Sequence, residues 1–126
     1  MLNVVISNKL DAPIYEQIKE QIRSAIIRDE IVENEMLPSI RSLAHELKIS
    51  VITTKRAYDE LEAEGFIASV QGKGCFVLPK NKEQIKEQKL REIEQHFIDA
   101  ITCSKLIDLG HGELREILDI LLKEEN

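Results

Sequence analysis

Basic side chains are concentrated in one short stretch of a chain that is acidic as a whole. The 126 residues include 17 Lys and Arg against 23 Asp and Glu, for a net charge of -6. Residues 37–56 reverse this balance, because they hold a single acid, Glu46, and four cations: Arg41, Lys48, Lys55 and Arg56. Such groups bind phosphate, and a guanidinium can also bind guanine through two hydrogen bonds. A local basic surface on an acidic body is therefore compatible with contact to a nucleic acid.

Small hydroxyl residues and glycines accompany these cations. Ser39, Ser50 and Thr53 stand near the starts of two predicted helices, where unpaired backbone N–H groups favour phosphate. A turn formed by Gly72, Lys73 and Gly74 lacks bulky side chains, so it can approach a sugar-phosphate backbone or enter a minor groove. Such turns are common in other proteins, and its position after the two helices is what favours the functional interpretation.

Three predicted helices position these groups. The first runs to about Asp29, with Asp11 as its N-cap and Pro13 in its first turn. The second and third are short amphipathic helices that begin at the N-caps Ser39 and Ser50. Because a tight turn joins the last two, together they predict a helix-turn-helix.

The first turns of the third helix carry the candidate base-reading residues. Its apolar side is expected to face the core through Thr54, Ala57, Tyr58 and Leu61. The outward side then presents Val51, Ile52, Lys55 and, less centrally, Arg56. In a helix-turn-helix the second helix enters the major groove by its N-terminal residues, so these four are expected to reach the bases.

The remaining residues predict a hairpin and two further helices. The β-rich runs Phe66–Val70 and Cys75–Val77 surround the glycine-bearing turn and predict a projecting wing. A long amphipathic helix is expected from residue 81 to about residue 104, and Gly110-His111-Gly112 separates it from a short final helix.

Apolar residues on these last two helices are expected to face a second subunit, since a winged helix already closes its own core. They are Leu90, Ile93, Phe97, Ile101, Leu114, Ile117, Leu118 and Leu121. The expected fold is therefore mainly α with a small β-hairpin wing. It comprises a winged helix-turn-helix domain for DNA binding over residues 1–80 and a short helical dimerisation region over residues 81–126.

Several motifs resemble the GntR family of winged helix-turn-helix regulators. They occur in the same order as in the family, and no insertion or deletion is needed to align them. They are Leu37-Pro38-Ser39-Ile40-Arg41-Ser42-Leu43-Ala44, Thr53-Thr54-Lys55-Arg56-Ala57-Tyr58, Leu61-Glu62-Ala63-Glu64-Gly65-Phe66-Ile67 and Gly72-Lys73-Gly74-Cys75-Phe76-Val77. The Ala57-Tyr58 pair and the short tail resemble the YtrA subfamily. The resemblance implies a homodimeric transcriptional repressor of a double-stranded DNA operator with an inverted repeat, often in transporter operons. It places DNA contacts on Ser39, Arg41, Ser50, Thr53, Lys55 and the Gly72-Lys73-Gly74 wing tip.

Three residues depart from the family pattern. Lys48 stands where many relatives have glycine, so a lysine is expected in left-handed backbone at a cost of about 1 kcal/mol. Val51 replaces a common arginine, which predicts an apolar contact, such as one to a thymine methyl group. Thr54 replaces a core aliphatic residue, and its hydroxyl is expected to bond to the carbonyl four residues earlier.

The histidines, the cysteines and the runs of carboxylates are expected to have structural roles rather than catalytic ones. The three histidines lack the spacing of metal ligands, and neither a metal nor a cofactor is predicted. Cys75 and Cys103 are expected to be small apolar residues of the core. Runs of carboxylates are expected to form solvated faces: Glu60, Glu62 and Glu64, and Glu124 and Glu125. An enzyme is not predicted, because no phosphate-binding loop or pair of nucleophile and base can be assembled.

The chain lacks an apolar stretch long enough for a membrane span, and its first nine residues lack the features of a signal peptide, so a cytoplasmic location is expected. A second interpretation, which the acidic net charge favours, is a protein-interaction module in which the winged helix is a docking surface and the acidic helices bind a basic partner. The basic excess in residues 37–56 argues against it, because a pure protein-docking surface does not need that charge. The residues identify no small-molecule effector.

Overall fold

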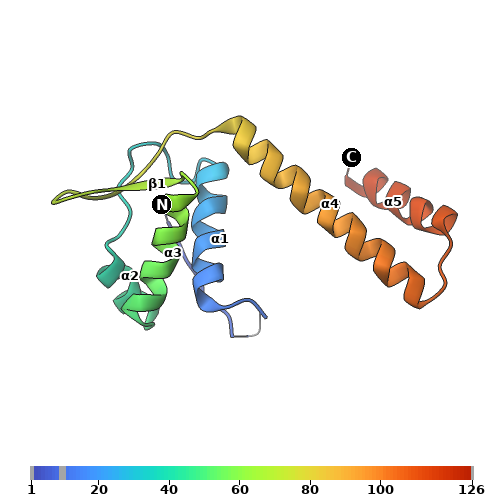
Figure 1. The fold of residues 1–126 in the computed structure, drawn as a ribbon, viewed down its shortest axis with the longest axis horizontal. Helices are drawn as coiled ribbons and strands as arrows, with labels where there is room; N and C mark the ends of the chain where they lie inside the picture. The colour runs from blue at the N-terminus through green and yellow to red at the C-terminus, as the bar shows by residue number, and fades with distance from the viewer. Residues whose placement is uncertain (1, 9–10, 126) are drawn as a thin grey trace. The chain divides into compact units, whose positions relative to one another are not determined.

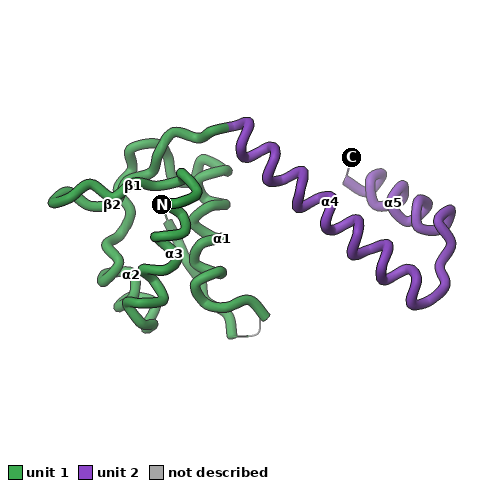
Figure 2. The backbone as a smooth tube through the Cα atoms, viewed as in Figure 1, with its two compact units in different colours: residues 1–81 green, residues 82–126 purple. Residues whose placement is uncertain are grey.

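The computed structural model describes residues 2–8 and 11–125, so residues 1 and 9 of the segment considered for a signal peptide lie outside it. The chain divides into two compact units, residues 1–81 and residues 82–126 (Figure 2). Unit 1 contains α1 (Ile14–Ile27), α2 (Ile40–Leu47), α3 (Val51–Ala63), β1 (Ile67–Val70) and β2 (Gly74–Val77), and unit 2 contains α4 (Lys82–Leu106) and α5 (His111–Glu125). The predicted fold class, mainly helical with a β-hairpin wing, is confirmed. None of the described helices combines the length and the hydropathy needed to cross a membrane.

The core of unit 1 lies between its three helices, and α1 and α3 run side by side (Figure 1). Ile18, Ile22 and Ile26 recur at four-residue steps on α1 and are at most 1% exposed. They meet the buried side of α3, where Ala57 and Leu61 are fully buried. The helical spacing of apolar residues therefore predicted the packed faces correctly.

The ends of α1 differ from the sequence-based expectation. Pro13 is the N-cap and offers no side-chain cap, while its carbonyl accepts from the N–H of Gln17 at 3.1 Å. Asp11 was therefore the wrong N-cap, because the chain turns into the helix only after the extended backbone of Pro13. The helix ends at Ile27, and Asp29 has a left-handed φ of 60°, which no α-helix can accommodate.

The N-terminal segment lies along α1 and is held there by two glutamines. Gln17 accepts from the Ser7 N–H and donates to the Ser7 carbonyl, both at 2.9 Å. Gln21 makes the equivalent pair with Val5, at 2.9 and 2.7 Å. The backbone N–H and C=O groups of Val5 and Ser7 are thus hydrogen-bonded to side chains of α1. In a β-sheet, alternate residues of a strand pair with the neighbouring strand in the same way.

The turn between α2 and α3 has the predicted conformation. Lys48, the C-cap of α2, has φ 58° and ψ 47°, which is left-handed backbone. Thr54 is fully buried, and its hydroxyl donates to the Ser50 carbonyl at 3.1 Å, as expected from the residue type. These two features allow α3 to begin after only three intervening residues, 48–50.

A third extended segment completes the wing. β1 and β2 pair antiparallel with Ile67 opposite Val77 and Val70 opposite Gly74. Met36, which lies between α1 and α2, forms a bridge with Phe76 on the other edge of β2. The flanking Leu37 N–H donates to the Cys75 carbonyl at 2.8 Å. The base of the wing is therefore held from both sides.

Unit 2 consists of two helices with almost no buried side chain. Ser104 is the single residue of unit 2 that is classed as buried among those described. Cys103 is exposed, which contradicts its expected place in a core, and Cys75 in the wing is half-buried. The break between the helices falls at Asp108, with a φ of 53°. His111 and Gly112 were expected in that break but belong to the first turn of α5, since Gly110 already accepts the first helical hydrogen bond, from Leu114 at 3.0 Å.

Candidate nucleic-acid interface

The N-terminal turn of α3 is exposed and rigidly capped. The Ser50 hydroxyl accepts from the Thr53 N–H at 3.1 Å and lies 2.7 Å from the Thr53 hydroxyl, so the predicted N-cap is confirmed. The next two side chains project into solvent, with Val51 46% and Ile52 82% exposed. Two adjacent apolar side chains therefore stand in solvent at the start of α3.

Lys55 continues this outward side, one turn further along α3. Its ammonium group forms an ion pair with Asp59 at 2.6 Å, and both side chains are more than half exposed. Ile52, Lys55 and Asp59 line one shallow groove on the outer side of the helix. The partner of Lys55 was missed in the sequence, although four-residue spacing is the expected signal for such a pair.

Arg56 is directed toward α1. Its guanidinium carbon lies 3.7 Å from the centre of the Tyr15 ring, a cation–π contact, and its Nε donates to Glu60 at 3.2 Å. The structure therefore gives Arg56 two partners within unit 1, one of them on α1, although its side chain is 59% exposed, close to the 61% of Lys55.

The start of α2 and the wing tip present further predicted contacts. The Ser39 hydroxyl accepts from the Ser42 N–H at 3.0 Å, which confirms the second predicted N-cap. Arg41 and Lys73 are exposed and form no ion pair within the described part of the chain. Gly72 and Gly74, with φ of 76° and 116°, give the tip its tight turn.

A network of buried ion pairs joins α1 to α3. Lys19, 9% exposed, binds Glu60 at 2.9 Å and Glu64 at 3.1 Å. Arg23, 5% exposed, binds the other oxygen of Glu64 at 3.1 Å and also pairs with Glu20. The expectation that Glu60 and Glu64 form a solvated face is thus wrong, because the packing of α1 against α3 places cations against both.

The pKa shifts in this network follow from its geometry. Burial alone would lower the pKa of Lys19, but hydrogen bonds to Glu60 and Glu64 outweigh burial and raise it above the ordinary value. Hydrogen bonds from Lys19 and Arg56 lower the pKa of Glu60. Both groups therefore stay charged around neutral pH and hold α3 against α1.

Two further contacts tie α3 to the start of α2 and to the wing. The Tyr58 hydroxyl donates to the Pro38 carbonyl at 2.7 Å, just before α2, and burial raises its pKa, so this donor stays protonated. Glu62, which is exposed as expected, accepts from the Ser69 N–H of β1 at 2.9 Å. α3 thus sets the position of both α2 and the wing.

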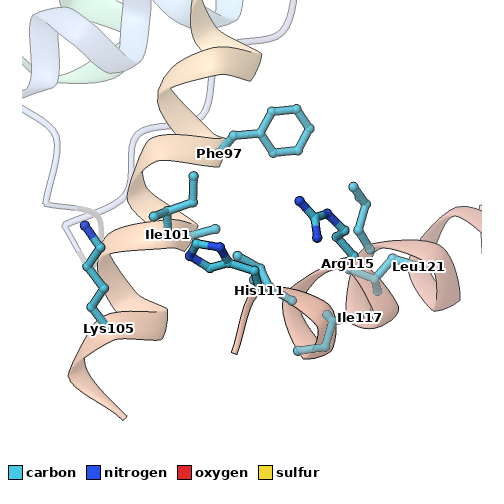
Figure 3. A pocket seen from close by; sticks show the side chains of 10 residues that line it. Phe97, Ile101, Lys105, His111, Arg115, Ile117 and Leu121 are labelled. Atoms are coloured by element: carbon cyan, nitrogen blue, oxygen red, sulfur yellow. The ribbon is translucent and has the colours of Figure 1, made fainter. Parts of the chain in front are cut away.

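Unit 2 carries an apolar groove between α4 and α5, of about 680 Å³. Phe97 and Arg115 both point into the space between the helices (Figure 3). The groove contains six of the eight residues predicted for a dimer interface: Phe97, Ile101, Leu114, Ile117, Leu118 and Leu121. The other two, Leu90 and Ile93, lie further toward the start of α4 and are about half exposed, at 53% and 48%.

A helix-turn-helix followed by a two-stranded wing defines the winged helix-turn-helix class. The family model described as "Bacterial regulatory proteins, gntR family" matches residues 14–77. The HTH-type transcriptional repressor YtrA of Bacillus subtilis is 30% identical over 118 residues, which cover 90% of this chain and 91% of that protein.

Two solved structures are also similar. One is YtrA from Sulfolobus acidocaldarius, a GntR-family transcription factor, with a TM-score of 0.59 and 33% identity over 72% of this chain and 97% of that one. The other is the DNA-binding domain of AraR in complex with operator ORX1, with a TM-score of 0.53 and 33% identity over 60% of this chain and 95% of that one. The chain belongs to the GntR family of bacterial regulatory proteins and, within it, to the YtrA subfamily.

Proposed function

We propose that the chain is a homodimeric transcriptional repressor that binds an inverted-repeat operator. Residues 1–80 bind one half-site, and residues 81–126 join two copies. The observation that carries this proposal is the capped N-terminal turn of α3, from which Val51, Ile52 and Lys55 project. The likeness of the chain to a domain solved in complex with an operator supports operator binding here. In a helix-turn-helix the second helix enters the major groove, and α3 takes that place in this chain.

The proposed contacts divide by chemistry. Val51 and Ile52 meet apolar base edges such as thymine methyl groups, and Lys55 hydrogen-bonds to bases beside them. Residues that position the protein on phosphates are Ser39, Arg41, Ser50, Thr53 and the Gly72-Lys73-Gly74 tip. Arg56 takes a supporting role, because its contacts to Tyr15 and Glu60 hold α3 in place.

The apolar surface of unit 2 supports a second copy as its partner. Phe97 and Leu121 are 50% and 53% exposed, and they lie on the two helices that line the groove. α4 and α5 also make few contacts with each other, so neither buries the apolar side of the other. A symmetric dimer removes both surfaces from water at once.

Selection of duplexes from a random pool, followed by mass measurement of the complexes, tests the proposal. We expect selected duplexes with two-fold symmetry, half-sites about one helical turn apart and two chains bound to each. The affinity should fall steeply with salt, with a log-log slope that grows by nearly one per phosphate contacted. A chain that selects no duplex, yet binds a basic protein, would instead support the docking-module interpretation.

A further inference from the structure

Lys48 has an unusual backbone conformation for its residue type. Four described residues other than glycine have positive φ, and three of them are Asp or Asn: Asp29, Asn34 and Asp108. Asp and Asn tolerate left-handed backbone because their short side chains bond locally, whereas lysine has no such compensation. Glycine would adopt the Lys48 conformation without strain. Lysine at this position therefore carries a backbone cost of about 1 kcal/mol that glycine would not.

The position of Lys48 indicates a use for its side chain. Arg41 and His45 are four residues apart and share one side of α2, Lys48 is the C-cap that follows the helix, and all three are exposed. Leu43, which is buried, lies on the opposite side of the helix. Within the described residues the Lys48 side chain makes no hydrogen bond or ion pair, and it stands two residues before Ser50, the cap of α3.

The basic stripe formed by Arg41, His45 and Lys48 also has a length that suits a phosphate backbone. From Arg41 to its last residue, Leu47, α2 rises by about 9 Å, and Lys48 follows directly, while a DNA strand carries one charge per ~3.4 Å of its axis. In a helix-turn-helix the first helix crosses the backbone as the second enters the groove. A basic stripe of this length can thus meet more than one phosphate of the same strand.

We propose that Arg41, His45 and Lys48 form a phosphate-binding ridge on α2, and that Lys48 extends the interface into the turn before α3. The inference rests on the proposed DNA-binding function and adds two residues to its contacts. The ridge neutralises phosphate charge and does not recognise bases. Loss of Lys48 therefore weakens binding to every duplex by the same factor.

Three variants of the full chain separate this role from a structural one. Lys48→Gly and Lys48→Asn remove the charge and keep residues that tolerate left-handed backbone, and Lys123→Asn removes an exposed lysine from unit 2 as the control. Binding is measured by fluorescence anisotropy between about 50 and 200 mM salt. The probes are a mixed-sequence duplex and a duplex selected from a random pool by the wild-type chain. Thermal unfolding of each variant reports on the fold.

We expect both Lys48 variants to bind either duplex three- to tenfold more weakly at roughly 0.1 M salt and to lower the log-log slope by about 0.9 per bound chain. Their Tm stays unchanged or rises, because the backbone strain is relieved. An affinity and a slope equal to those of Lys123→Asn would overturn the ridge and leave Lys48 as a helix-terminal charge only. Loss of affinity for the selected duplex alone would also overturn the ridge, because it would show that Lys48 contacts a base rather than a phosphate. A wild-type chain that binds neither duplex would overturn the proposed function itself.

Discussion

Arg56 lies over the ring of Tyr15, with 3.7 Å between its guanidinium carbon and the ring centre. The contact joins α3 to α1 and places two adjacent cations of one helix in different environments. Lys55 projects from the outer side of α3 with a side chain 61% exposed, whereas Arg56 is engaged with Tyr15 and Glu60. Charge alone does not distinguish these two residues, but packing does.

Substitution of these neighbours should therefore have opposite consequences. We expect Lys55→Gln to weaken binding to a selected duplex about tenfold and to leave the free energy of unfolding nearly unchanged. Arg56→Gln should lower the free energy of unfolding by about 1 kcal/mol and reduce affinity less. Anisotropy titration and urea denaturation of both variants provide the measurements. Equal losses of affinity would show that Arg56 also contacts DNA directly.

Removal of Asp59 should strengthen DNA binding. Its carboxylate pairs with Lys55 at 2.6 Å and adds negative charge to the side of α3 that faces a duplex. We expect Asp59→Asn to raise the affinity about three- to tenfold at low salt, and to change Tm little because exposed pairs contribute only about 0.5 kcal/mol. Asp119→Asn, an exposed acid of α5, is the matched control. An unchanged affinity would place Asp59 outside the interface.

Glu64 should contribute strongly to stability because it bridges two buried cations. Lys19 and Arg23 each bind one of its oxygens at 3.1 Å. Glu64→Gln leaves both cations short of a charged partner, and we expect a loss of about 2 kcal/mol in the free energy of unfolding. Glu46→Gln, at an exposed position on α2, should change it by less than about 0.5 kcal/mol. Similar urea midpoints for the two variants would contradict the bridging role.

The same network predicts a loss of stability in acid. The lowered pKa of Glu60 means that its contribution is complete above its unfolded value of about 4.3 and disappears as the pH falls through the lower, folded value. Lys19 has the reverse sign: its contribution is complete below about pH 10.4 and is lost only as the pH rises through its raised pKa. Urea unfolding of the wild type and Glu60→Gln should therefore converge as the pH falls below about 4. A constant difference down to pH 3 would argue against the Glu60 contacts.

Charge placed in the groove of unit 2 should separate the subunits without unfolding unit 1. We expect Phe97→Glu to shift the mass in light scattering from two chains to one, because it replaces a half-exposed apolar contact by a hydrated carboxylate whose burial in a largely apolar groove is costly. Val32→Glu adds the same charge at an exposed apolar residue of unit 1 and should leave the mass unchanged. Affinity for the full inverted repeat should fall with Phe97→Glu, while binding to a single half-site persists. A Phe97→Glu chain that remains dimeric would exclude this groove as the interface.

Local patterns in the sequence were sufficient for the elements and for most of the proposed DNA contacts. Helical spacing identified the core sides of α1 and α3, the residue types at Ser39 and Ser50 identified the N-caps of α2 and α3, and the glycines around Lys73 identified the turn of the wing. Each of these features depends on residues within about four positions of one another, so it is readable without knowledge of the fold.

Tertiary packing decided which charged groups meet. Lys19 and Glu60 are 41 positions apart, and no local rule pairs them or separates Arg56 from Lys55. The same is true of Met36, whose pairing with Phe76 depends on where the wing folds back. The partner of a cation is set by the distance between helices after the core has formed, and that distance is a property of the folded chain rather than of any segment within it.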